Sequence, residues 1–305
     1  MLPIFNMGSS LANYLISLLL FSSNLFFPQI GFVVTIFVPI FLIKFFLDEN
    51  RKQIDNIVFL LGVLGILIFL PYFGIYYMII SVLPAYFIYM YHNKKLSEKI
   101  DLILLSSFPI LIFTLVILFF LTDYKTAISD YLTLYLETVI KNYESVTNPG
   151  EYNTYLLYIK NNLKKIVFVV IHLMPALSFV YVSFISTVAK RYYLKRYRLR
   201  EPRYKVNDKL IIPFLVGGFL ILSNNLYLRI ASYNTLTIFG ILFFYQGADI
   251  VNFYMNKFRM RAFLRFIIYF LIFSEPYVIV VVAVAGLIDN WFDLTKVTFK
   301  RKNSL

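Results

Sequence analysis

Two carboxylates, Asp249 and Glu275, lie inside long apolar stretches of the sequence. An ionised side chain at the centre of a bilayer costs at least about 2.5–3.5 kcal/mol, so it needs a counter-charge, a proton or a water-filled cavity. Acids in such a position could bind a cation, a proton or an amine group of a solute. These two residues are therefore the first candidates for a functional site.

Asp249 belongs to a polar stripe in the sequence Gln246-Gly-Ala-Asp249-Ile-Val-Asn252. At about 100° per residue, these three polar residues fall on one face of a helix. The small residues Gly247 and Ala248 would let a neighbouring helix approach closely. The stripe fits two interpretations, which are hydrogen bonding between helices and a face that contacts a ligand or ion.

Glu275 directly precedes Pro276, and proline removes a backbone donor and disturbs a helix. A broken helix with an acid at the break recurs in transporter sites. The alternative is a proline kink at which Glu275 is protonated or paired with a cation. Arg229 is the nearest cation that precedes Asp249 in the sequence and is predicted to pair with it if the chain folds back closely. The candidate ligand-binding residues are Gln246, Asp249, Asn252, Glu275, Asn224 and Asn225.

The composition indicates a membrane protein. Of 305 residues, 60% are hydrophobic and only 15% are charged, whereas soluble domains are about 45–50% apolar and about 25% charged. The absence of cysteine excludes disulfides, thiolate nucleophiles, iron–sulfur clusters and cysteine-ligated zinc. The two histidines, His92 and His172, form no zinc motif. The sequence therefore predicts no catalytic residue, no metal site and no cofactor.

Nine apolar segments have roughly the length that a helix needs to cross about 30 Å of hydrocarbon. Helices are expected because every backbone polar group must be satisfied inside lipid. The predicted fold is an all-α, polytopic transmembrane bundle of eight or nine spanning helices, in a single membrane domain over residues 1–305. The segments are Leu11–Phe27, Ile30–Leu47, Asn56–Leu70, Tyr72–Tyr91, Asp101–Leu121, Ile166–Val188, Leu210–Leu226, Leu236–Tyr254 and Phe263–Ile288.

Lysine and arginine gather in alternate connections, which sets the orientation of the chain. The basic connections follow the second, fourth, sixth and eighth segments, so we expect a cytoplasmic N-terminus in a bacterial inner membrane. The first ten residues carry no Lys or Arg, which favours a retained helix over a secretory signal. Nine crossings would place the basic tail outside. Either the tail is external, or the short third segment or the proline-broken last segment does not cross fully.

The predicted cytoplasmic loop at residues 189–208 carries the densest basic run, interleaved with tyrosines. A topology determinant, a contact for anionic lipid and a contact for a partner all fit this run, while nucleic acid is an unlikely partner in a membrane protein. The residues proposed for this contact are Arg191, Lys195, Arg196, Arg198 and Arg200.

The connection at residues 122–165 is the only long one, and the orientation places it outside the cell. Apolar residues from Ile128 to Tyr143 recur at three- and four-residue spacing, which predicts an amphipathic extracytoplasmic helix. Asn148-Pro149-Gly150 is a turn signal that should end it. Such a helix packs on the membrane surface or forms a lid over the bundle.

Two motifs carry a resemblance to a known family. Phe244-Tyr-Gln246-Gly247-Ala-Asp249-Ile-Val-Asn252-Phe-Tyr254 and Gly286-Leu-Ile-Asp289-Asn-Trp291-Phe-Asp293-Leu-Thr-Lys296 resemble the C-terminal half of the YybS-like family of bacterial multi-pass membrane proteins. The second motif departs from the family pattern at Thr295-Lys296, where Arg-Lys is usual. The family is distantly similar to the substrate-capture subunits of energy-coupling-factor transporters, which implies a small-molecule-binding membrane component by fold analogy.

The sequence thus favours binding or transport of a small solute or cation at an intramembrane polar site, with the bilayer and another membrane subunit as candidate partners. The alternative is a non-transporting scaffold that anchors a partner through the basic cytoplasmic loops. An intramembrane enzyme has no motif in its favour.

Overall fold

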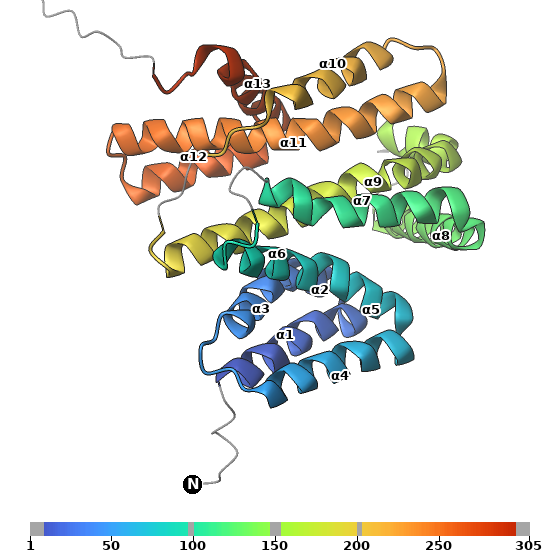
Figure 1. Cartoon of the computed structure of the whole chain (residues 1–305). Coiled ribbons are helices and arrows are strands. Elements are labelled where there is room, and N and C mark those ends of the chain that lie inside the picture. Colours follow the sequence, from blue (N-terminus) through green and yellow to red (C-terminus); the bar gives the residue numbers. More distant parts are fainter. Residues whose placement is uncertain (1–8, 97–100, 147–153, 200–202, 297–305) are drawn as a thin grey trace, which may run out of the picture. The chain divides into compact units, whose positions relative to one another are not determined.

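The computed structural model describes residues 9–96, 101–146, 154–199 and 203–296. Throughout these residues the chain forms helices and no strand (Figure 1), which confirms the all-α class. Among the described residues, five helices are long and apolar enough to cross a membrane, and a bent helix pair raises the number to six. Two further apolar helices are shorter, so the eight or nine crossings stay a prediction.

The chain divides into two compact units. Unit 1 consists of Met1–Pro149 with Leu177–Glu201, and unit 2 consists of Gly150–Ala176 with Pro202–Leu305. The 43-residue helix α9 (Thr154–Arg196) contributes its first half to unit 2 and its second half to unit 1. No shift in composition marks this division in the sequence, because both units consist of the same kind of apolar helix.

Prolines set the helix boundaries of unit 1. Pro28 and Pro71 each occupy the first turn of a new helix, where the missing N–H is not needed. The helices are α1 (Ser9–Phe26), α2 (Pro28–Val34), η2 (Thr35–Phe37), α3 (Val38–Phe46), α4 (Gln53–Phe69), α5 (Pro71–Tyr77), the π-helical η3 (Met78–Val82), α6 (Leu83–His92), α7 (Leu102–Phe120) and α8 (Thr122–Val146).

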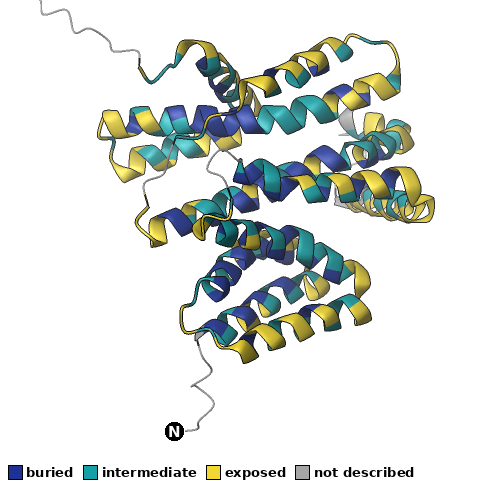
Figure 2. Ribbon diagram, viewed as in Figure 1, coloured by how far each residue is buried: buried dark blue, intermediate teal, exposed yellow. Residues whose placement is uncertain are grey.

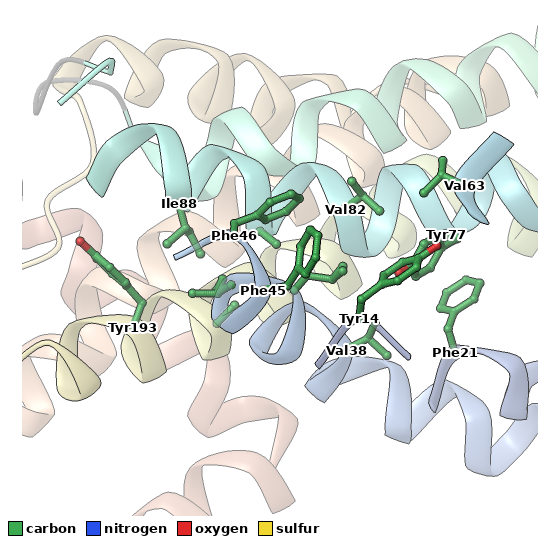
Figure 3. Close-up of a cluster of buried hydrophobic side chains, with 14 of the residues drawn as sticks. Tyr14, Phe21, Val38, Phe45, Phe46, Val63, Tyr77, Val82, Ile88 and Tyr193 are labelled. Carbon is green, nitrogen blue, oxygen red and sulfur yellow. The ribbon is translucent and has the colours of Figure 1, made fainter. Parts of the chain in front are cut away.

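Aromatic side chains fill the core of unit 1 (Figure 3). Tyr14, Phe21, Phe45 and Tyr77 are almost fully buried, and the Ser17 hydroxyl lies 2.9 Å from the Tyr77 hydroxyl. Large apolar side chains also remain exposed on many outer helix faces (Figure 2). A soluble protein would hide such faces, whereas lipid covers them without cost.

Helix α8 confirms the amphipathic helix predicted after residue 122. It runs for 25 residues and ends at Val146, immediately before residues 147–153, so the predicted turn at Asn148-Pro149-Gly150 lies outside the described residues. Tyr131, Leu134 and Tyr135 remain exposed on it. Its position on the outer side of the membrane stays a prediction.

Unit 2 joins the first half of α9 to η4 (Asp208–Leu210), α10 (Ile211–Leu220), α11 (Leu226–Lys257), α12 (Ala262–Ser274) and α13 (Pro276–Phe292). The Asn234 side chain inserts into α9 beside Pro175. Its Nδ2 donates to the His172 carbonyl at 2.8 Å, and its Oδ1 accepts from the Ala176 backbone N–H at 3.1 Å. Asn234 therefore hydrogen-bonds to the carbonyl and the N–H of two residues one turn apart in α9 and links α11 to α9.

Candidate functional site

The crossing of α11 and α13 depends on two glycines. A Cβ atom on Gly247 would overlap the Val282 carbonyl oxygen, and one on Gly286 would overlap the Phe243 carbonyl oxygen. Only glycine therefore allows the two backbones to approach this closely, as in other membrane helix pairs with small residues at the contact. The crossing brings the polar end of α13 beside the polar stripe of α11.

Gln246 is the centre of the resulting polar cluster and is fully buried. Its Oε1 accepts a hydrogen bond from the Val206 backbone N–H at 2.9 Å. Its Nε2 donates to Asp289 Oδ2 at 2.8 Å and to Asn290 Oδ1 at 3.1 Å. One amide side chain thus joins α11, α13 and the segment that precedes η4.

Asp289 is a buried carboxylate whose two oxygens are both occupied. Oδ2 forms an ion pair with the Arg203 guanidinium and accepts from Gln246, and Oδ1 accepts from the Leu294 backbone N–H at 2.8 Å. Arg203 also donates through Nη1 to Asp293 Oδ1 at 3.1 Å and to the Thr295 hydroxyl at 2.7 Å. A buried charge of this kind is tolerated because it is paired and hydrogen-bonded.

Asp293 ends α13 in the left-handed conformation, with φ 40°. Its carboxylate forms an ion pair with Lys296 at 2.8 Å and accepts from the Thr295 hydroxyl at 2.9 Å. The contact with Lys296, and then the one with Thr295, holds the pKa of Asp293 well below its usual range. The same carboxylate raises the pKa of Lys296, so both groups are charged at neutral pH.

Asp249 is half-buried and accepts a hydrogen bond from the Tyr204 backbone N–H at 2.8 Å. Asn252 is half-buried one turn further along α11. The predicted stripe therefore contacts a neighbouring segment of the chain through Gln246 and Asp249. Because these contacts leave open whether a ligand also binds, the site itself stays a prediction.

Glu275 does not join this cluster. It is exposed and forms the corner between α12 and α13, whose axes differ by 103°. The apolar segment Phe263–Ile288 is therefore broken at Glu275, as the proline predicts, because Pro276 starts a new helix in another direction; whether the pair forms one span stays a prediction. Glu275 lies 14 residues, or about 21 Å of helix, before Asp289.

Asn224 and Asn225 lie in the exposed turn before α11. Asn225 caps that helix, because its Oδ1 accepts from the backbone N–H groups of Tyr227 at 2.9 Å and Leu228 at 3.4 Å. Arg229 and Asp249 lie on the same continuous helix, 20 residues or about 30 Å apart. The predicted pairing of Arg229 with Asp249 is therefore wrong.

The basic residues proposed for lipid or partner contact lie at the end of α9, in unit 1. Arg191, Lys195, Arg196 and Arg198 are exposed, and Arg200 lies outside the described residues. Two contacts join this end to the ends of α3 and α6. Lys44 Nζ lies 5.5 Å from the Tyr192 ring centroid, and His92 Nδ1 lies 2.8 Å from the Tyr193 hydroxyl.

Sequence reasoning missed Arg203, Asp289, Asn290 and Asp293 as members of the cluster. In the sequence, Arg203 belongs to the basic loop at residues 189–208, and the other three belong to the second family motif. The four-residue spacing of Asp289 and Asp293 puts two acids on one helix face, a signal that could have indicated a cation partner. Their partner, Arg203, precedes Asp289 by 86 residues and Asp293 by 90 residues, a separation that carries no local pattern.

A comparison with protein families bears on this geometry. A family model described as "Predicted membrane protein (DUF2232)" matches residues 15–290. The chain belongs to this family. The match covers the polar stripe of α11 and the first five residues of the α13 motif, Gly286 to Asn290, and it supports a membrane protein of unknown function with several apolar helices. The YybS-like relationship and the likeness to energy-coupling-factor subunits stay predictions. No curated protein and no solved structure matches the chain.

Proposed function

We propose that this DUF2232 protein is a non-transporting membrane scaffold that holds an anionic partner at the cytoplasmic surface of the bacterial inner membrane. One observation carries the proposal. Gln246 and Asp249, the residues best suited to a solute site, accept hydrogen bonds from the backbone N–H groups of Val206 and Tyr204, while four cations near the end of α9 are exposed. The polar stripe thus serves to fix the chain segment that follows the basic loop.

The partner that fits these cations best is the phosphate of an anionic phospholipid. Tyrosines accompany the cations at the helix end, and tyrosine prefers the membrane–water interface. A cation near an anionic membrane surface contributes about 1 kcal/mol. Four such cations, Arg191, Lys195, Arg196 and Arg198, would contribute at most about 4 kcal/mol, enough to enrich anionic lipid around the protein.

Native mass spectrometry of the full chain released from nanodiscs tests the proposal. The nanodiscs contain equal amounts of phosphatidylglycerol and phosphatidylcholine, and the expected result is retention of phosphatidylglycerol. Neutralising the four cations to glutamine should abolish the preference. The matched control neutralises four other lysines to glutamine, on α8 and the start of α9, and should keep the preference: Lys125, Lys141, Lys160 and Lys164. Equal loss in both variants refutes the proposal.

Binding of a small solute is the second candidate, and a different observation favours it. In the part of the chain that the structure describes, Arg203 Nε and Asn290 Nδ2 are buried donors without a hydrogen-bond partner. A carboxylate or phosphate group of a solute could accept from both. A thermal-stability screen with small carboxylates and phosphates tests this. Stabilisation that is lost in Arg203→Lys and kept in Lys257→Gln would favour solute binding over the scaffold.

A further inference from the structure

The helix pair α12–α13 does not continue in one direction. Its axes differ by 103°, and the two helices contain 13 and 17 residues. At 1.5 Å per residue they are about 20 Å and about 26 Å long. Each is shorter than the roughly 30 Å of hydrocarbon in a bilayer. The positions of the two ends of the pair therefore decide whether it crosses the bilayer or returns to the side from which it entered.

Both ends of the pair lie at the same end of α11. Helix α12 begins five residues after α11 ends at Lys257. The far end of α13 lies against the last three turns of α11, since Asn290 accepts from Gln246 and the Leu294 carbonyl accepts from the Tyr254 hydroxyl at 2.6 Å. The chain therefore leaves α11, turns at Glu275 and returns to the region that it left.

The segment at residues 203–206 is fixed to this same end of α11. Tyr204 and Val206 donate to Asp249 and Gln246, and Arg203 pairs with Asp289 and Asp293. The segment therefore lies on the same side of the membrane as the two ends of the helix pair.

The charges identify which side this is. Cations are concentrated in the 203–209 segment, in the turn at residues 257–261 with the first turn of α12, and in the residues after α13: Arg203, Lys205, Lys209, Lys257, Arg259, Arg261, Arg265, Lys296, Lys300, Arg301 and Lys302. The turn between α10 and α11, at residues 221–225, carries none. Positive charge in short connections marks the cytoplasmic side.

We infer that α12 and α13 enter and leave the membrane on one side, so that the C-terminal tail lies in the cytoplasm together with the basic turn at residues 257–261. Eight apolar segments are predicted before α12, and an even number of crossings also leaves the N-terminus inside. This resolves the conflict between nine crossings and a basic tail. The inference does not depend on the proposed lipid contact, because it rests on contacts within unit 2.

Cysteine labelling of the full-length protein tests the inference, because the natural chain contains no cysteine and gives no background. Three single variants are compared in intact spheroplasts with a membrane-impermeant maleimide. Ser304→Cys reports the tail, Asn256→Cys the end of α11, and Asn224→Cys the opposite turn.

We expect Asn224→Cys to react in intact spheroplasts, and the other two variants to react only after permeabilisation. Reaction of Ser304→Cys in intact spheroplasts overturns the inference. A monodisperse gel-filtration profile for each variant shows that the labelled protein is folded. Loss of lipid preference in the nanodisc experiment would leave this labelling pattern unchanged, so the two proposals fail independently.

Discussion

Replacement of Gln246 by leucine should destabilise unit 2, because this side chain joins three segments. Leucine fills a similar volume but cannot hydrogen-bond. The substitution leaves the buried Val206 N–H without an acceptor and removes one donor from the buried Asp289 carboxylate. Each buried polar group left unpaired costs roughly 1–3 kcal/mol.

The unpaired Val206 N–H, together with the donor lost by Asp289 and by Asn290, is offset in part by the apolar burial of leucine and gives an expected loss of about 2–4 kcal/mol. For chains of 150–250 residues, 1 kcal/mol shifts the melting temperature by roughly 2–4 °C. The expected decrease in melting temperature for Gln246→Leu is therefore about 5–15 °C. A decrease of that size would show that the polar stripe of α11 stabilises the fold.

Tryptophan fluorescence during thermal unfolding in detergent is a direct assay, because the chain has one tryptophan and this residue, Trp291, directly follows Asn290. The matched control is Asn256→Leu, an exposed polar position on the same helix, which should change stability by less than about 0.5 kcal/mol. If the melting temperatures of Gln246→Leu and Asn256→Leu differ by less than about 1 °C, the proposed stabilising role of the cluster is refuted.

Three further predictions use the same fluorescence assay. Gly286→Ala should lower stability by about 1–3 kcal/mol because the new methyl group forces two backbones apart. Gly218→Ala should not lower it, because no atom lies within 4 Å of a Cβ added at that position. Equal effects of the two substitutions would contradict the close crossing. Asn234→Leu should cost about 1–3 kcal/mol because it removes two hydrogen bonds between α11 and α9, and an unchanged melting temperature would contradict that role. The pKa of Asp293 is lowered by Lys296 and Thr295, so the stability that this carboxylate contributes is present above the unfolded pKa of about 3.9 and is lost as the pH falls below it. The contribution of Asp293 to the melting temperature should therefore be constant from about pH 5 to 9. Asp293→Asn should reduce the decrease in melting temperature at acid pH, and an unchanged decrease in that variant would contradict the ion pair.

The sequence by itself determined the helical membrane class and most helix positions. Long apolar stretches leave lipid as the only solvent that suits them, and lipid demands helices. Pro28 and Pro71 each start a helix, close to the predicted segment starts at Ile30 and Tyr72. The 3.6-residue periodicity after residue 122 predicted α8, because an amphipathic face is a property of consecutive residues.

The polar stripe of α11 was also predictable, but its partners were not. The side-chain types of Gln246 and Asp249 indicated an interior face, while the backbone N–H groups that they contact belong to residues of no distinctive type. Backbone donors are present at nearly every position, so no sequence pattern marks the ones that a side chain will reach.

Only the tertiary structure decided that Asp249 and Glu275 have different surroundings. Asp249 contacts the segment after the basic loop, and Glu275 lies at an exposed corner. Arg203 pairs with Asp289 across 86 residues of sequence because Gly247 and Gly286 let α11 and α13 cross closely. Composition and periodicity describe one helix at a time, whereas the pairing of charges depends on how two helices meet.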